Sequence, residues 1–98
     1  MIRSEAIRQS ARGEMCLLNG PTCNYNRETT VFCHINEGFA GKGIGIKAQD
    51  YAGFYGCSAC HTAYDTGQLG EDKYFYLLRA MVWTLGRLVE KGIITVKL

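Results

Sequence analysis

The sequence predicts a small α+β domain with one long C-terminal helix, and three observations carry this prediction. Residues 29–35 (TTVFCHI) are β-branched and aromatic, which is typical of a strand. Over residues 72–91, apolar residues recur at every third or fourth position, as on one face of a helix. Four of the five cysteines form two pairs that lie far apart in the chain. With 98 residues, the chain has room for one domain.

The remaining elements are predicted from shorter patterns. Residues 2–12 are expected to form a short helix, and residues 61–66 a helical turn or two. We interpret residues 51–56 as an aromatic connector and residues 93–98 (IITVKL) as a short final strand. The glycine-rich stretch at 36–47 is expected to be a loop that ligands can contact.

The long helix expected at residues 72–91 has a clear end signal, because Gly92 follows its last periodic position and suits a C-terminal cap. Gly86 lies inside the helix at a cost of about 1 kcal/mol relative to alanine, which suggests close packing against a neighbour. The apolar positions of this helix are Tyr74, Leu77, Leu78, Met81, Val82, Leu85, Leu88 and Val89.

Composition excludes several classes of protein. Residues 1–15 are charged throughout and lack the apolar core of a secretory signal. No stretch approaches the ~20 apolar residues of a membrane span. We therefore expect a cytoplasmic protein, in which five cysteines indicate metal ligands rather than disulfides. The net charge of +2 does not by itself indicate a partner.

The paired cysteines fit a zinc site. Cys57 and Cys60 are two residues apart, so a tight turn can point both sulfurs to one side, and Cys16 and Cys23 flank a Gly-Pro turn. We expect these four to hold one structural Zn²⁺ in a tetrahedron. A redox pair is the alternative for the CxxC motif, but such pairs usually lie in a βαβ unit, which the pattern lacks. His61 could also replace one cysteine.

The positions of the two histidines in the sequence indicate a kind of functional site. His34 ends the expected strand just before the glycine-rich loop, and His61 directly follows the CxxC motif. Either alone would be interpreted as an ordinary structural side chain. Together, the order of strand-end histidine, loop and CxxCH is that of an HNH, or ββα-metal, nuclease site. Cys33, between apolar neighbours, is expected to be a buried small hydrophobe.

Three segments resemble the YbcO nuclease family of lambdoid phages and prophages: residues 12–16 (RGEMC), 24–35 (NYNRETTVFCHI) and 57–65 (CSACHTAYD). The family is HNH-like, and the similarity covers most of the chain. It implies a single HNH-like nuclease domain over residues 1–98, with a small zinc-bound ββα-metal core and the long helix behind it. It also implies a phage-derived, metal-dependent DNA endonuclease or nickase that hydrolyses phosphodiester bonds.

The resemblance also implies roles for single residues. His34 matches the general base that takes a proton from the attacking water. His61 matches a ligand of a catalytic divalent ion, Mg²⁺ or Mn²⁺. Asp50 falls near the middle asparagine of HNH proteins, which holds the loop and orients the base. The four paired cysteines match the structural zinc knuckle.

One position departs from the HNH pattern. Many HNH enzymes have an aspartate directly before the first histidine, where it helps to hold the catalytic metal. Cys33 stands there in this chain and is a poor ligand for a hard cation. Asp65 lies four residues after His61, so the two share a helix face and could converge on one ion. A solvated carboxylate is the equal alternative for Asp65, and Glu37 is a weaker candidate ligand.

DNA is the partner that the resemblance implies, and Arg12, Arg27, Lys42 and Lys47 are candidates for phosphate contacts. A phage or host recombination protein is a further candidate partner, no membrane contact is expected, and the oligomeric state is open. The alternative function is a non-catalytic, zinc-stabilised module that binds DNA or a protein in phage recombination. Cys33 and the low net charge favour it. A zinc ribbon whose long helix contacts a protein is a third interpretation.

Overall fold

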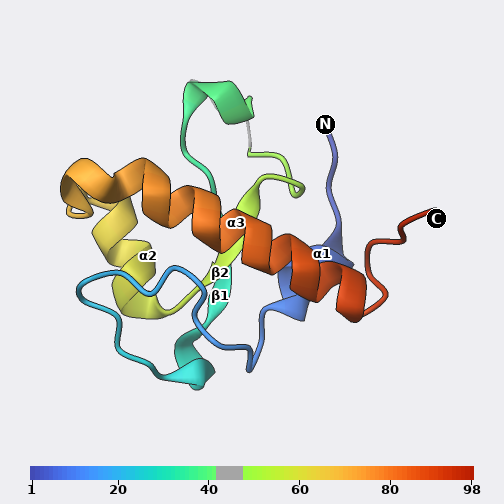
Figure 1. Ribbon diagram of the computed structural model, residues 1–98, viewed down its shortest axis with the longest axis horizontal. Helices are drawn as coiled ribbons and strands as arrows, with labels where there is room; N and C mark the ends of the chain where they lie inside the picture. Colours follow the sequence, from blue (N-terminus) through green and yellow to red (C-terminus); the bar gives the residue numbers. More distant parts are fainter. Residues whose placement is uncertain (42–47) are drawn as a thin grey trace.

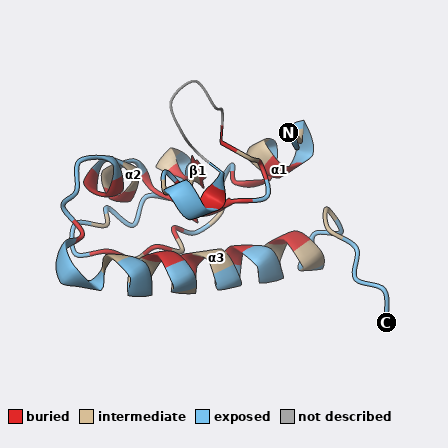
Figure 2. Cartoon of the chain, turned by 90° about the horizontal axis from the view of Figure 1, so that it is seen from above, coloured by how far each residue is buried: buried red, intermediate tan, exposed pale blue. Residues whose placement is uncertain are grey.

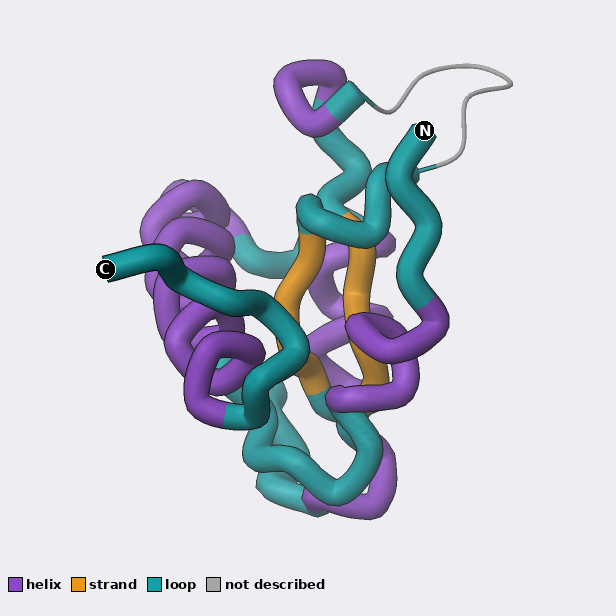
Figure 3. Tube along the Cα trace, turned by 90° about the vertical axis from the view of Figure 1, so that its right-hand side faces the viewer, coloured by secondary structure: helices purple, strands orange, loops and turns teal. Residues whose placement is uncertain are grey.

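The computed structural model describes residues 1–41 and 48–98. Its regular elements are helix α1 (Glu5–Ser10), strands β1 (Val31–His34) and β2 (Gly53–Gly56), helix α2 (Ser58–Asp65) and helix α3 (Lys73–Glu90), with single 3₁₀ turns at Arg27–Thr29, Gly38–Ala40 and Gly70–Asp72. The two strands lie side by side with the helices around them (Figure 3). Helix α3 runs across the sheet, with α2 toward one end and α1 toward the other (Figure 1). The predicted small α+β fold with a long C-terminal helix is confirmed.

The sheet is an antiparallel pair in which Phe32 lies opposite Tyr55 and His34 opposite Gly53. Side chains alternate between its two faces. Cys33 lies in the larger core cluster, whereas Phe32 packs with Tyr55 against a second cluster formed with α1 and the end of α3. Because of this alternation, His34 points to the face opposite that of Cys33.

The prediction of a connector at residues 51–56 is wrong, because residues 53–56 form β2. Glycines occupy both ends of this strand because there is no room for side chains. A Cβ atom on Gly53 would lie 2.5 Å from the ring of Phe32, and one on Gly56 would lie 2.9 Å from the sulfur of Cys33. The strand therefore lacks the β-branched composition by which strands are found in a sequence.

Helix α3 is attached to the free edge of β2 through Tyr55. The backbone N–H of Tyr55 donates to the Thr84 hydroxyl at 3.0 Å, and its carbonyl accepts from the Leu17 amide at 2.8 Å. These two bonds satisfy the groups that an edge strand leaves unpaired. They explain why a threonine is fully buried on α3.

The expected end of α3 is confirmed, because Gly92 has a φ of 72° and the amides of Ile93 and Ile94 bond back to the carbonyl of Leu88. The predicted strand at 93–98 is wrong. Ile93 and Ile94 pack against the cluster around Tyr55 and Leu88 instead of pairing with another strand. The expected packing at Gly86 is also wrong, because its Cβ position faces open space.

The helix expected at 61–66 begins earlier, at Ser58, because the sulfur of Cys57 caps it by accepting the amide of Cys60 at 3.3 Å. Helix α1 is shorter than expected and is capped by Ser4. Of the glycine-rich stretch, residues 42–47 lie outside the described part, and so do the phosphate-contact candidates Lys42 and Lys47. In the parts that the structure describes, no helix has the length and apolar character needed to cross a bilayer.

The contact between Thr84 and Tyr55 gives a test of the edge attachment. We expect Thr84→Val to lower the free energy of unfolding by about 2 kcal/mol, because a buried N–H loses its acceptor at almost constant side-chain volume. Urea unfolding measures the change. Thr62→Val on the exposed face of α2 is the matched control. Equal stability of the two variants would contradict the assigned role.

Candidate metal centre and active-site cleft

The sulfurs of Cys16, Cys23, Cys57 and Cys60 lie within 4.8 Å of one another. Those of Cys23 and Cys57 are 3.8 Å apart. This separation matches the edge of a tetrahedron whose corners lie about 2.3 Å from its centre, the usual zinc–sulfur distance. The four residues therefore fit a metal ion such as zinc, as the sequence predicts.

Backbone amides support the Cys57 sulfur. It accepts the Cys60 amide, and the Asn24 amide at 3.5 Å. Such bonds stabilise a thiolate and hold both sulfurs of the CxxC turn on one side. The local fold thus prepares a metal ligand at the N-cap of α2.

The thiols of Cys16, Cys23 and Cys60 do not ionise independently. A hydrogen bond from the Cys60 thiol lowers the pKa of Cys16 to about 4, and the same bond raises the pKa of Cys60. Burial raises the pKa of Cys23 to about 11. Ionisation of one of these thiols therefore opposes ionisation of the next, and a bound divalent cation would remove that opposition.

Arg79 of α3 fixes the loop between Cys16 and Cys23. Its guanidinium donates to the carbonyl of Leu18 at 2.8 Å and reaches that of Asn19 at 3.5 Å. Asn19 turns the loop with a φ of 49°. Three aromatic rings of α3 surround the same guanidinium, those of Phe75, Tyr76 and Trp83.

Cys33 is not part of the sulfur cluster. It is fully buried, its thiol points at the carbonyl of Gly56 at 3.8 Å, and burial raises its pKa. The prediction of a buried small hydrophobe is confirmed. Because its side chain points into the core on the face opposite that of His34, Cys33 cannot replace the aspartate that HNH enzymes have there.

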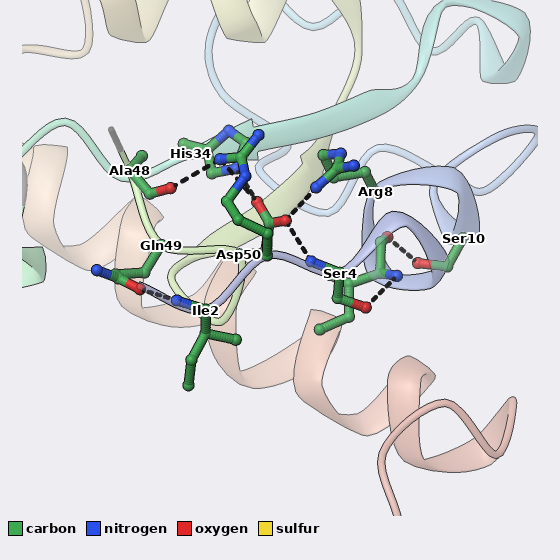
Figure 4. A network of polar contacts seen from close by, with 10 residues as sticks. Ile2, Ser4, Arg8, Ser10, His34, Ala48, Gln49 and Asp50 are labelled. Atoms are coloured by element: carbon green, nitrogen blue, oxygen red, sulfur yellow. Dashed lines mark hydrogen bonds and ion pairs between the residues drawn. The ribbon is translucent and has the colours of Figure 1, made fainter. Parts of the chain in front are cut away.

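The carboxylate of Asp50 holds His34 in place. Its Oδ1 lies 2.7 Å from Nε2 of His34, and its Oδ2 accepts the Ser4 amide at 2.6 Å and the guanidinium of Arg8 (Figure 4). The guanidinium of Arg3 lies 3.6 Å from Oδ1. Asp50 is fully buried, so the residues just before and within α1 anchor the histidine through it.

The charge of Asp50 sets the tautomer of His34. Burial acts to raise the pKa of Asp50, but the hydrogen bonds that it accepts, first of all with His34, outweigh burial and hold the pKa below its usual value. An ionised carboxylate only accepts, so we assign the proton of neutral His34 to Nε2. The lone pair of the ring is then on Nδ1.

His61 and Asp65 lie one turn apart on α2, with Nε2 of His61 3.2 Å from Oδ2 of Asp65. The other oxygen of Asp65 accepts the side-chain amide of Asn36 at 2.9 Å. Both side chains remain partly exposed, at 40% and 42%. The prediction that they share one helix face agrees with this geometry.

One open cleft of about 460 Å³ contains both histidines. Its lining residues are Arg3, Phe32, His34, Asn36, Ala48, His61 and Asp65. The cleft is thus bounded by the end of β1 on one side and by α2 on the other. Asp50 lies behind His34 and does not line the cleft, which fits a residue that orients another.

The remaining candidates lie elsewhere. Arg12 and Arg27 are exposed but do not line this cleft. Glu37 pairs with Lys73 at 2.9 Å and accepts the Tyr64 hydroxyl at 3.3 Å. Sequence reasoning missed Arg3 and Asn36 as cleft residues, because the hydrogen bonds that bring residues 2–4 beside residues 48–50 leave no local signal.

A family model described as "Putative nuclease YbcO" matches residues 5–92. The chain belongs to the YbcO family. The resemblance of the three segments in the sequence is thereby confirmed, and membership indicates a nuclease in the broad sense of an enzyme that hydrolyses nucleic acids.

A solved structure is similar to this YbcO family member. It is titled as that of a putative bacteriophage protein from Escherichia coli K-12, and it is 31% identical in sequence with a TM-score of 0.69. The match covers 89% of this chain and 100% of that one. Among curated proteins, no sequence matches the chain.

The sulfur cluster gives a prediction about metal content. We expect the purified YbcO family member to contain about one zinc per chain and to unfold on chelation, because four ionised sulfurs lose their counter-charge. Cys57→Ser should abolish stoichiometric zinc. Cys33→Ala is the matched control and should keep it. Metal analysis that finds a folded, metal-free wild type would contradict the prediction.

The buried carboxylate gives a second prediction. We expect Asp50→Asn to lower the free energy of unfolding at pH 7 by about 3 kcal/mol, because an amide N–H would face the donors that now bond the carboxylate. The pKa of Asp50 is depressed in the folded state, so its contribution is present above about pH 4 and is lost as the pH falls through the folded pKa.

Urea unfolding at several pH values measures this difference, which should shrink in acid. Asp65→Asn, at an exposed carboxylate, is the control and should change stability by less than about 0.5 kcal/mol. A loss from Asp50→Asn that stays constant below pH 4 would argue against the charge as its cause.

Proposed function

We propose that this YbcO family member is a phage-derived, metal-dependent DNA endonuclease or nickase of the HNH type. The single observation that carries the proposal is the common cleft of His34, His61 and Asp65. The order of two antiparallel strands followed by a helix, β1, β2 and α2, supports a ββα-metal core. The similar bacteriophage protein from Escherichia coli supports the phage origin.

In this proposal, His34 is the general base. Its Nδ1 accepts a proton from the attacking water, and the positive charge that develops on the ring is stabilised by Asp50 at Nε2. Asp50 also prevents rotation of the ring, so the lone pair keeps one direction. A carboxylate that accepts a hydrogen bond from one nitrogen of a catalytic histidine generally orients the ring in this way.

His61 and Asp65 are the proposed ligands of a divalent ion. One imidazole nitrogen and one carboxylate suit Mg²⁺ or Mn²⁺, which complete their shells with water and phosphate oxygens. Such an ion, when bound, polarises the scissile phosphate and stabilises the leaving oxygen. Asn36 orients Asp65 through Oδ1 and leaves Oδ2 toward His61.

Arg3 supplies positive charge at the His34 side of the cleft. Its guanidinium donates to the carbonyl of Ala48 at 3.1 Å and keeps further N–H groups for a phosphate oxygen. The cleft therefore combines a base, two metal ligands and a phosphate-binding group. That set is what hydrolysis of a phosphodiester requires.

A plasmid-nicking assay with Mg²⁺ or Mn²⁺ tests the proposal. We expect His34→Ala to reduce the nicking rate by at least ~100-fold, since a general base contributes about that much. Asp65→Asn should raise the metal concentration needed for half-maximal rate. Asp72→Asn, at an exposed carboxylate outside the cleft, is the matched control.

Equal rates for wild type and His34→Ala at every metal concentration would end the catalytic proposal. Salt-sensitive DNA binding without cleavage under any divalent ion would instead indicate the zinc-stabilised binding module.

A further inference from the structure

Helix α3 has a second apolar face besides the one that packs on the sheet. Its buried positions are Leu77, Ala80, Thr84 and Leu88. About one third of a turn around the helix lies a second row of apolar side chains, which we call the α3 outer face: Tyr74, Leu78, Met81, Val82, Leu85 and Val89. Four of these six are more than half exposed, and exposed positions of α3 point away from the sheet (Figure 2).

An apolar groove of about 250 Å³ borders this face. It lies between α3 and the side chains of Phe32, Tyr51 and Ile94, and no charged residue lines it. Within the described residues, nothing covers either the groove or the α3 outer face. A continuous uncharged surface of this kind marks a protein interface, because single exposed apolar residues are ordinary but contiguous ones are not.

The spacing of the outer face is symmetric about the midpoint between Met81 and Val82. The symmetric pairs are Met81 with Val82, Leu78 with Leu85, and Tyr74 with Val89. If two copies of α3 lie antiparallel across a two-fold axis at this point, each apolar residue meets its symmetric counterpart. A two-fold interface requires such a self-complementary surface.

In this antiparallel arrangement the two helix dipoles run in opposite directions, which is favourable. DNA is a poor occupant of this surface, because the outer face and the groove have no cation for a phosphate.

The available area is sufficient for a dimer. The exposed apolar side chains of the outer face and of Tyr51 offer on the order of 600–800 Å² per copy, close to the ~800 Å² per partner of a standard interface. We propose that the protein forms a two-fold homodimer through the α3 outer face, with the two helices antiparallel and the Met81–Val82 midpoint on the axis.

Sedimentation velocity over a wide range of concentration tests the dimer. We expect the wild type to have twice the mass of one chain. Leu78→Glu should raise the dissociation constant of the dimer by at least ~100-fold, because the variant dimer would bury two unpaired carboxylates. Leu78 is 66% exposed in the single chain, so the variant should keep its fold and zinc content. Met15→Glu, at an exposed apolar residue outside α3, is the matched control and should remain dimeric.

A mixing experiment tests the antiparallel register. Leu78→Glu and Leu85→Lys should each be monomeric, but their equimolar mixture should form a heterodimer, because the proposed register pairs position 78 with position 85 of the other copy. A wild type that stays monomeric at all concentrations, or a Leu78→Glu variant that stays dimeric, would overturn the dimer. A mixture that remains monomeric would overturn the antiparallel pairing.

Discussion

The buried carboxylate of Asp50 is the interaction on which the architecture of the cleft depends. It joins three separate parts of the chain: the segment before α1, the last turn of that helix, and the last residue of β1. An uncompensated charge at a fully buried position would be very costly, so these donors are obligatory partners rather than optional contacts. The same bonds that hold the N-terminal segment on the sheet also give His34 a fixed orientation, so in the proposed function stability and catalysis depend on one residue.

The sulfur cluster fixes the opposite side of the cleft. It brings the loop between Cys16 and Cys23 to the junction of β2 and α2, and the capping sulfur of Cys57 sets where α2 begins. The first turn of α2 in turn sets the position of His61. A small chain buries only a modest core, so such a cluster adds stability where packing alone is limited. The cleft thus lies between two polar groups of residues: the Asp50 carboxylate with its donors, and the four cysteines.

Much of this arrangement could be predicted from sequence because it is encoded locally. The long helix has a strong periodicity and a glycine stop, and the CxxCH motif carries both a metal-ligand spacing and a helix start. Strand β2 could not be predicted because its terminal residues must be glycines, which leave room for the ring of Phe32 and the sulfur of Cys33. Only the tertiary structure brings these groups near. The final strand was wrongly predicted because β-branched residues also suit a capping segment that packs on Tyr55. Arg3 and Asn36 could not be placed in the cleft, since long-range hydrogen bonds have no sequence period.

The contact of Arg79 with the loop carbonyls has a spectroscopic consequence. Trp83 is the single tryptophan of the chain, and the guanidinium of Arg79 lies 5.2 Å from the centre of its ring. The emission of an indole depends on nearby charge and on solvent access, and here the guanidinium beside the ring is tied to the loop that carries Cys16 and Cys23. The intrinsic fluorescence of this protein is therefore a built-in reporter of how tightly that loop is held against the long helix.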